Sequence, residues 1–296
     1  MYRVIIWGIG REYNKYYNLI KYFEQMGEIT VQAVFSNDKI NSATLDGFAI
    51  CSKEQVKIME YDLCLVAVAD FCSVKIEAKE LGISEAKLLP IRVLGIPYFS
   101  FEKYIKVRNS KITILSNNCW AGLCYHYLDL EFKSPTINMF FEGSQFIKFV
   151  SNLDYYLSVP LEFIEMRYEK NLNRNYPIAK IDDIRLHFNH YISFEEAQKC
   201  WERRKQRINK NNILIVFNST SKEALVEFQK LKFEHKLVFV PKDMEISNLD
   251  VYPVDYNDIG TGITFGMYVN GFANGAISDF DLLSFLCHEK YMRKNR

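Results

Sequence analysis

Short apolar runs alternate with helical patterns along the first hundred residues. Residues 4–7 form an apolar run after which residues 15–26 carry apolar side chains at helical spacing. Further apolar runs cover 29–35 and 63–68, and a helix is expected over 74–81. Strands that alternate with helices predict a Rossmann-like parallel sheet with right-handed crossovers.

The pattern restarts after a connector at 96–110, which carries Pro97 and a short charged helix. The predicted elements of this second half are strands at 112–115, 212–217 and 237–240 and helices at 120–128, 144–157, 194–208 and 222–231. Residues 259–278 carry no charge but several glycines and asparagines, which predicts loops and short strands. We therefore expect an α/β protein with two domains, 1–105 and 106–296, each built on a mainly parallel sheet.

Composition restricts the class of protein without identifying it. The 296 residues are 49% hydrophobic and 25% charged, as in ordinary globular proteins, and the net charge is only +1. No strong basic field is present, so we expect no nucleic-acid partner. The polarity of 259–278 argues against a membrane span, and no signal peptide is evident. Seven scattered cysteines without a C-x-x-C pair predict reduced thiols in the cytoplasm and no metal site.

The turn Gly8-x-Gly10 follows the first strand and precedes a helix. Glycines in that place let a phosphate approach backbone N–H groups at a helix N-terminus. Arg11 is a candidate phosphate contact, and Asp38, after the second strand, is a candidate ligand for a ribose hydroxyl. Tyr13 stands where the full fingerprint has a third glycine. The alternative is a Rossmann-like turn that only packs.

Polar residues also follow the strand at 112–115. Ligands of open α/β sheets bind beyond the carboxyl ends of strands, and amide side chains suit sugar hydroxyls. Ser116, Asn117 and Asn118 are therefore candidate substrate ligands. The alternative is that the asparagines serve only a local turn.

Cys119 is a candidate nucleophile if a base lies beside it. His126 is two helical turns away, about 10 Å along the axis, which is too far for a hydrogen bond. The base would have to be His187 or His190. The alternative is a buried thiol that acts as a small hydrophobe.

Two acids and two histidines crowd the segment 182–190. The apolar alternation favours a strand whose polar face carries Asp183, Arg185 and His187, with His190 beyond its end. Asp182 and Asp183 are candidate bases and His187 a candidate catalytic residue, while His190 is a candidate substrate ligand. The alternative is a half-buried strand with a solvated face.

Two further segments carry polar chemistry. The helix at 194–208 begins with the capping-box spacing of Ser193 and Glu196, and Arg204 lies on its apolar stripe. Arg204 should therefore face inward and need a partner, which makes it a candidate ligand contact. Residues 218–221 could bind an anion, but capping of the next helix is the simpler reading.

Several motifs in the second half occur together and in order. They are SNNCWAG at 116–122, SPTIN at 134–138, DYYL at 154–157, DDI at 182–184, HFNHY at 187–191, SFEEA at 193–197 and WERR at 201–204. Over 106–296 the chain resembles a bacterial family of unknown function whose members are often labelled exopolysaccharide biosynthesis proteins. In that family the strand near 217 tends to end in an acid, whereas here it ends in Asn218, which weakens a metal or base role there.

The first hundred residues are similar to small Rossmann-like domains fused to sugar-modifying transferases. That resemblance rests on Gly8-x-Gly10, on Asn37-Asp38 after the second strand, and on Asp46-Gly47. It implies binding of a nucleotide sugar.

The two resemblances lead to one functional hypothesis, a sugar-related transferase or its accessory subunit in surface polysaccharide assembly. Gly8, Gly10 and Asp38 would hold a nucleotide portion, and residues 116–118 with His187 would line a saccharide pocket. Polysaccharide-assembly proteins and a second copy of the chain are the expected partners. The rival hypotheses are a non-catalytic scaffold of a glycosyltransferase complex and a Cys-dependent acyl transferase or hydrolase.

Overall fold

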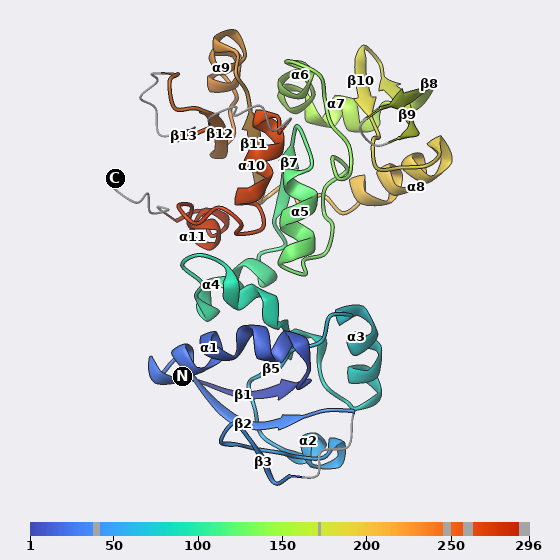
Figure 1. The fold of residues 1–296 in the computed structure, drawn as a ribbon. Coiled ribbons are helices and arrows are strands. Elements are labelled where there is room, and N and C mark those ends of the chain that lie inside the picture. Colours follow the sequence, from blue (N-terminus) through green and yellow to red (C-terminus); the bar gives the residue numbers. More distant parts are fainter. Residues whose placement is uncertain (38–41, 171–172, 245–249, 257–262, 290–296) are drawn as a thin grey trace. The chain divides into compact units, whose positions relative to one another are not determined.

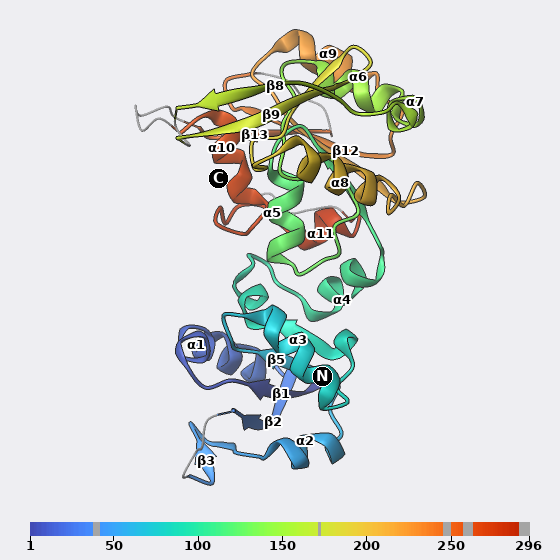
Figure 2. The ribbon, with the colours of Figure 1, turned by 90° about the vertical axis from the view of Figure 1, so that its right-hand side faces the viewer.

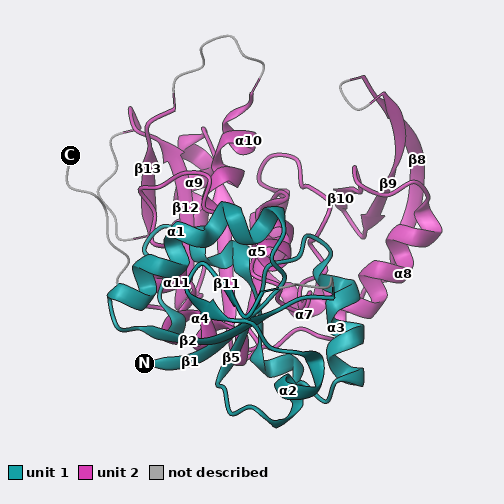
Figure 3. Cartoon of the chain, turned by 60° about the horizontal axis from the view of Figure 1, so that its bottom comes forward, with its two compact units in different colours: residues 1–101 teal, residues 102–296 magenta. Residues whose placement is uncertain are grey.

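The computed structural model describes residues 1–37, 42–170, 173–244, 250–256 and 263–289. They form two compact units, residues 1–101 and 102–296 (Figure 3). No helix in these ranges is long and apolar enough to cross a membrane.

Unit 1 is built on a four-stranded parallel sheet of order β2-β1-β5-β6 (Figure 1). Its strands are β1 (Tyr2–Trp7), β2 (Ile29–Phe35), β5 (Leu63–Val66) and β6 (Leu88–Pro90), and a small hairpin joins β3 (Thr44–Leu45) to β4 (Phe48–Ala49). Its helices are α1 (Arg11–Gln25), α2 (Lys53–Ile58) and α3 (Phe71–Glu80), with 3-10 turns η1 (Glu85–Lys87) and η2 (Ile91–Gly95).

Local sequence sets the ends of these helices. Gly27, which has a φ of +70°, follows α1, a conformation that glycine adopts without steric cost. Ser52 and Gln55 form a capping box that begins α2, and the Asp70 carboxylate accepts the N–H of Ser73 to begin α3. Each helix then returns the chain to the amino end of the next strand.

Unit 2 contains a second parallel sheet, of order β13-β12-β11-β7. Its strands are β7 (Thr113–Ser116), β11 (Ile213–Asn218), β12 (His235–Pro241) and β13 (Val251–Val254). Its helices are α4 (Phe101–Asn109), which begins at the unit boundary, α5 (Trp120–Tyr127), α6 (Gln145–Ser151), α7 (Leu153–Ser158), α8 (Phe194–Lys205), α9 (Lys222–Gln229), α10 (Phe265–Val269) and α11 (Leu282–Leu286), with η3 (Asn270–Phe272). Two parallel sheets flanked by helices confirm the predicted α/β class.

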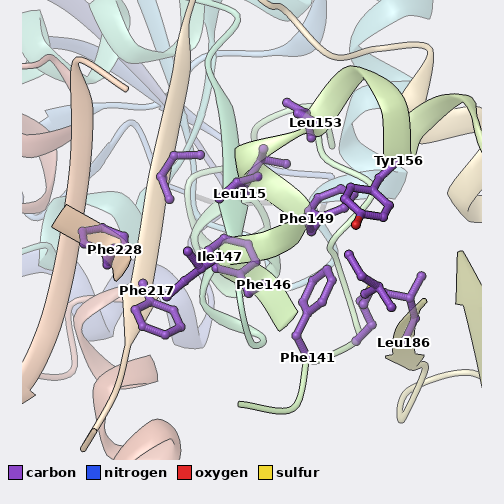
Figure 4. Close-up of a cluster of buried hydrophobic side chains, with 14 of the residues drawn as sticks. Leu115, Phe141, Phe146, Ile147, Phe149, Leu153, Tyr156, Leu186, Phe217 and Phe228 are labelled. Atoms are coloured by element: carbon purple, nitrogen blue, oxygen red, sulfur yellow. The ribbon is translucent and has the colours of Figure 1, made fainter. Parts of the chain in front are cut away.

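Helices cover both faces of this second sheet. On one face Phe217 stacks between Phe146 of α6 and Phe228 of α9, within the cluster drawn in Figure 4. On the other face Trp120 of α5 lies beside Phe239 of β12, with ring centroids 6.3 Å apart. The connections that leave β7 and β11 therefore pass to opposite faces of the sheet.

The long connection between β7 and β11 carries a separate antiparallel sheet of order β10-β9-β8, which the views in Figures 1 and 2 place beside α8. Its strands are β8 (Glu162–Glu169), β9 (Arg174–Ile181) and β10 (Ile184–His187). Only the strand at 184–187 was expected from the sequence. β8 was not predicted because its sequence lacks the regular apolar and polar alternation of a half-buried strand. In the structure most of its side chains are exposed.

Two other expectations were wrong in detail. The predicted helix over 144–157 is broken at Asn152 into α6 and α7, because that residue has φ −134° and ψ 52°. The described part of 259–278 contains α10 and η3 instead of strands. Thr264 begins α10 by accepting the N–H of Met267, a capping signal inside a segment read as loop.

Candidate functional site

Each unit has a cavity at the carboxyl edge of its parallel sheet. In unit 1 the cavity measures about 470 Å³ and lies where β1, β2 and β5 end. Its lining includes Gly8, Gly10, Arg11, Asn37 and Asp70. The turn that the sequence singled out is therefore brought together with the end of the second strand, as in dinucleotide-binding folds. Asp38 lies outside the described residues.

The fold requires glycine at position 8 of this turn but not at position 10. Gly8 has a φ of +104°, and a Cβ there would lie 2.7 Å from the carbonyl oxygen of Ala67. Gly8 is thus required by the close approach of the segment after β5. At Gly10 a Cβ would meet no atom within 4 Å. The fold does not need glycine at position 10, which faces open space beside the helix N-terminus.

The unit 2 cavity measures about 640 Å³ and lies at the carboxyl ends of β7 and β11. Because the connections from these two strands pass to opposite faces, the cavity occupies the topological switch point of the sheet, where open α/β sheets bind ligands. Amide, hydroxyl and aromatic side chains dominate its lining, with two acids at its rim. The lining side chains are Asn117, Phe141, Ser144, Phe217, Asn218, Ser219, Thr220, Ser221, Glu223, Ala224, Glu227, Thr264 and Phe265.

Asn117 and Asn218 join the two strands at the floor of this cavity. The Asn117 Oδ1 accepts the backbone N–H of Asn218 at 3.2 Å and its Nδ2 at 2.9 Å. The Asn117 Nδ2 donates to the Asn218 carbonyl at 3.2 Å. These three hydrogen bonds hold the carboxyl ends of β7 and β11 together at the switch point.

The other two polar residues of that predicted group bond inside the protein. Ser116 is buried, and its hydroxyl donates to the Asn118 carbonyl and accepts the N–H of Ala121. The Asn118 amide accepts the N–H of Trp120 and donates to the Gly266 carbonyl at 3.1 Å. Both residues position the start of α5, and Asn118 also holds α10 against the cavity.

Cys119 lies beside a histidine from another part of the chain. Its Sγ is 3.2 Å from the Nε2 of His190, which follows β10. Burial raises the pKa of the Cys119 thiol to about 11. Partial loss of hydration around the exposed His190 ring lowers its pKa, and the nearby charge of Arg174 lowers it further. At neutral pH the pair is therefore a thiol and an uncharged imidazole.

His187 does not share the polar face predicted for it. It is fully buried, stacked on Phe140 with centroids 4.5 Å apart, and the backbone groups of these two residues pair. Its Nδ1 lies 3.3 Å from the Tyr176 hydroxyl, while its Nε2 is 3.1 Å from a Glu142 oxygen without hydrogen-bond alignment. The backbone pairing with Phe140 covers the end of β10, which explains why His187 is buried. This burial lowers the pKa of His187.

Asp182 and Asp183 form the tight turn between β9 and β10 and do not line the unit 2 cavity. The Tyr155 hydroxyl donates to Asp182 at 2.8 Å, and Tyr156 and Lys148 donate to Asp183. The Lys148 ammonium holds the pKa of Asp183 below its usual range, which makes it a weaker base. The structure does not bring these acids together with residues 116–118.

Arg204 faces inward, as predicted, and finds its partners within the protein. Its Nη1 donates to the Tyr191 hydroxyl at 2.5 Å and to the Ile137 carbonyl at 3.3 Å. Its guanidinium also lies over the Phe132 ring. These contacts tie α8 to the segment that follows α5. Ser193 and Ser221 likewise begin α8 and α9 as capping residues, as expected.

The described residues contain no group of three or more histidines, cysteines and acids that could hold a metal ion. The cavities at the two carboxyl edges are therefore candidate ligand sites, and Cys119 with His190 is a candidate reactive pair.

Comparison with known families agrees with the division into two units. A family described as Domain of unknown function (DUF1919) matches residues 91–287. The chain belongs to the DUF1919 family. Residues 1–89 match a second family, described as C2185-like, N-terminal.

A relative of this DUF1919 chain is an uncharacterized protein of Haemophilus influenzae. The two are 31% identical over 142 residues, which are 46% of this chain and 65% of the relative. The chain thus spans about two thirds of the length of that protein.

Sequence reasoning missed part of the cavity wall in the DUF1919 region. Ser144, Thr264 and Phe265 line it, but they lie far from the strand ends that drew attention. One signal was available at Gly266, where a Cβ would lie 3.1 Å from the Asn218 Oδ1. Gly266 lies in the uncharged segment 259–278, and its lack of a side chain lets α10 approach Asn218.

Proposed function

We propose that this protein is a sugar-related transferase, or the accessory subunit of one, in the assembly of a bacterial surface polysaccharide. Its ligands would be a nucleotide sugar, held in part by unit 1, and a saccharide, held by unit 2. The supporting observation is the cavity at the switch point of unit 2, because its lining suits a neutral polyhydroxylated ligand. Such a role places the protein in the cytoplasm, among other polysaccharide-assembly proteins.

The unit 2 cavity offers two kinds of contact that sugars use. Amides and hydroxyls can donate to and accept from sugar hydroxyls, and an aromatic face can cover the apolar face of a pyranose ring. Ser144 and Thr220 are exposed, and neither side-chain hydroxyl bonds to a described residue. Phe265 supplies a ring at the same cavity. A volume of about 640 Å³ lies within the usual range of ligand pockets.

The unit 1 cavity suits the nucleotide portion. Gly10 begins α1, which has no side-chain cap, so backbone N–H groups of the first turn face the cavity region. Arg11 stands beside them as a cation for a phosphate. The carboxylates of Asp70 and Glu77 line the same cavity and can accept ribose hydroxyls.

Calorimetric titration with a panel of nucleotide sugars, free nucleotides and oligosaccharides tests the proposal. Gly10→Val should fill the unit 1 cavity without a clash and weaken nucleotide binding at least tenfold. The double variant Ser144→Ala, Thr220→Ala should weaken saccharide binding by about 30-fold, since each lost hydroxyl contact contributes about 1 kcal/mol and each 1.4 kcal/mol is tenfold. Ser158→Ala, which removes an exposed hydroxyl at the end of α7, is the matched control.

The outcomes separate the two units. Binding of any panel member that all these variants leave unchanged would place the ligand elsewhere and contradict the assignment of the cavities. A protein that binds no member of the panel but captures a glycosyltransferase would favour the scaffold hypothesis.

A further inference from the structure

We propose that Cys119 and His190 are a nucleophile and its base, and that they take an acyl group from an ester or thioester. This activity goes beyond sugar binding, and only the choice of a sugar hydroxyl as the acceptor rests on the proposed function. The observation that carries it is the contact of 3.2 Å between Cys119 Sγ and His190 Nε2.

The two residues are positioned by separate elements. Cys119 is the first residue of the turn that begins α5, at the carboxyl end of β7, where ligands of open α/β sheets meet the protein. His190 lies beyond the end of β10 and is exposed, while Cys119 is half-buried. They are 71 residues apart in sequence, so the tertiary fold creates the contact.

The surroundings hold the pair in one place. Asn118, next to Cys119, accepts from Trp120 and donates to Gly266. On the other side, Arg174 donates to the Asn189 carbonyl at 2.7 Å, next to His190. A nucleophile and a base held on braced neighbours need little reorganisation to react.

The resting protonation states suit base-assisted attack. The half-buried thiol of Cys119 keeps its proton at neutral pH. The imidazole of His190 is uncharged at neutral pH and can take that proton. The thiolate then forms only as the carbonyl carbon is attacked.

The reaction balances with an acyl donor and an acceptor hydroxyl. Cys119 Sγ forms a bond to the carbonyl carbon while its proton passes to His190 Nε2. The bond from that carbon to the leaving oxygen or sulfur breaks, and His190 returns the proton to the leaving group. An acceptor hydroxyl, of water or of a sugar, then gives its proton to His190 and attacks the thioester, which releases the acyl group and restores the thiol.

Neighbouring residues connect the pair to the unit 2 cavity, although neither Cys119 nor His190 lines that cavity. Asn117 lines the unit 2 cavity two residues before Cys119, and Gly266 lines it while bonding to Asn118. In this proposal a saccharide held in that cavity supplies the acceptor hydroxyl. The acyl donor class that fits is therefore an acyl ester or thioester whose acyl group ends on, or leaves, a sugar hydroxyl.

The test uses the full chain and p-nitrophenyl acetate as the acyl donor. We expect release of about one equivalent of p-nitrophenolate in a burst, with the acetyl group located on Cys119 by peptide mass spectrometry. Cys119→Ser should abolish the burst. His190→Asn should slow acylation about 100-fold, the effect of losing a positioned base.

Two matched controls come from the same chain. His126→Asn replaces another exposed histidine, on α5, and should leave the burst unchanged. Cys72 is an exposed thiol in unit 1. Its rate of acylation serves as the reference for a cysteine that reacts only because it is exposed. Thermal melting and circular dichroism of each variant confirm that it is folded, and His190→Gln serves if His190→Asn is not.

The result that overturns the proposal is equally direct. Acylation of Cys119 no faster than that of Cys72, or an equal rate in folded His190 variants, would show that the contact is structural only.

Discussion

Gly8→Ala should destabilise unit 1 strongly, whereas Gly10→Ala, two residues away, should not. The difference follows from their backbone and surroundings. Gly8 adopts a φ of +104°, and an added Cβ would lie 2.7 Å from the Ala67 carbonyl oxygen and 2.8 Å from Val68 Cγ2. Gly10 has a φ of −84° and open space around the Cβ position.

The expected cost at position 8 combines two effects. A non-glycine residue at positive φ costs about 1–2 kcal/mol. Overpacking against a rigid neighbour adds about 1–3 kcal/mol. The backbone around Ala67 cannot move away without losing hydrogen bonds. The Gly8 N–H donates to the Phe35 carbonyl at 2.8 Å, and the Ala67 N–H donates to the Trp7 carbonyl at 2.7 Å. We therefore expect a loss of about 3 kcal/mol for Gly8→Ala and a change within about 1 kcal/mol for Gly10→Ala.

Hydrogen exchange measured by mass spectrometry resolves this difference by segment. In Gly8→Ala, amides of β1 and β5 should exchange faster by about two orders of magnitude, since each 1.4 kcal/mol is tenfold. Amides of β11, in unit 2, are the internal reference. Equal exchange in the two alanine variants would refute the assignment of Gly8 as the structural glycine and Gly10 as the one that faces the cavity.

Three further predictions concern unit 2. Burial of the ring and the charge of nearby His235 lower the pKa of His288 to about 4, so the unfolded chain binds a proton at a higher pH than the folded chain. Unit 2 should therefore lose about 1–2 kcal/mol as pH falls from about 6.5 to about 4, because solvent screens this partly exposed ring. A urea-unfolding profile that His288→Asn leaves unaltered would argue against this. Arg204→Ala should cost about 2 kcal/mol, because the buried Tyr191 hydroxyl loses its donor, and an unshifted melting temperature would disprove that role. Tyr125→Phe should cost about 2 kcal/mol, because its hydroxyl accepts the N–H of Ile114 in β7 and donates to the carbonyl of Ile112 just before that strand. Unchanged exchange of β7 amides would contradict this prediction.

Most of the parallel strands were predictable because they are largely buried on both faces, whereas β13 was not predicted. The apolar runs at 29–35 and 63–68 correspond to β2 and β5, and the predicted βαβ unit of the second half corresponds to β11, α9 and β12. Continuous apolar runs bounded by polar turns are a local signal, so a single sequence suffices to find them. Ser193 and Ser221 marked the starts of α8 and α9 for the same reason.

The candidate site was less predictable because its contacts are distant in sequence. Strand ends pointed to Asn117 and Asn218, and both line the unit 2 cavity. The burial of His187 depends on its pairing with Phe140, which no local pattern records. The sequence left His187 and His190 as equal partners for Cys119, and only the path of the chain after β10 selects His190.

The most direct test of the proposed ligand class is a hydrogen-exchange footprint with the nucleotide sugar that calorimetry selects. We predict protection of residues 8–12 at the start of α1, lost in Gly10→Val, and protection of residues 218–221 when the saccharide is added. Protection confined to other segments would contradict the assignment of both cavities.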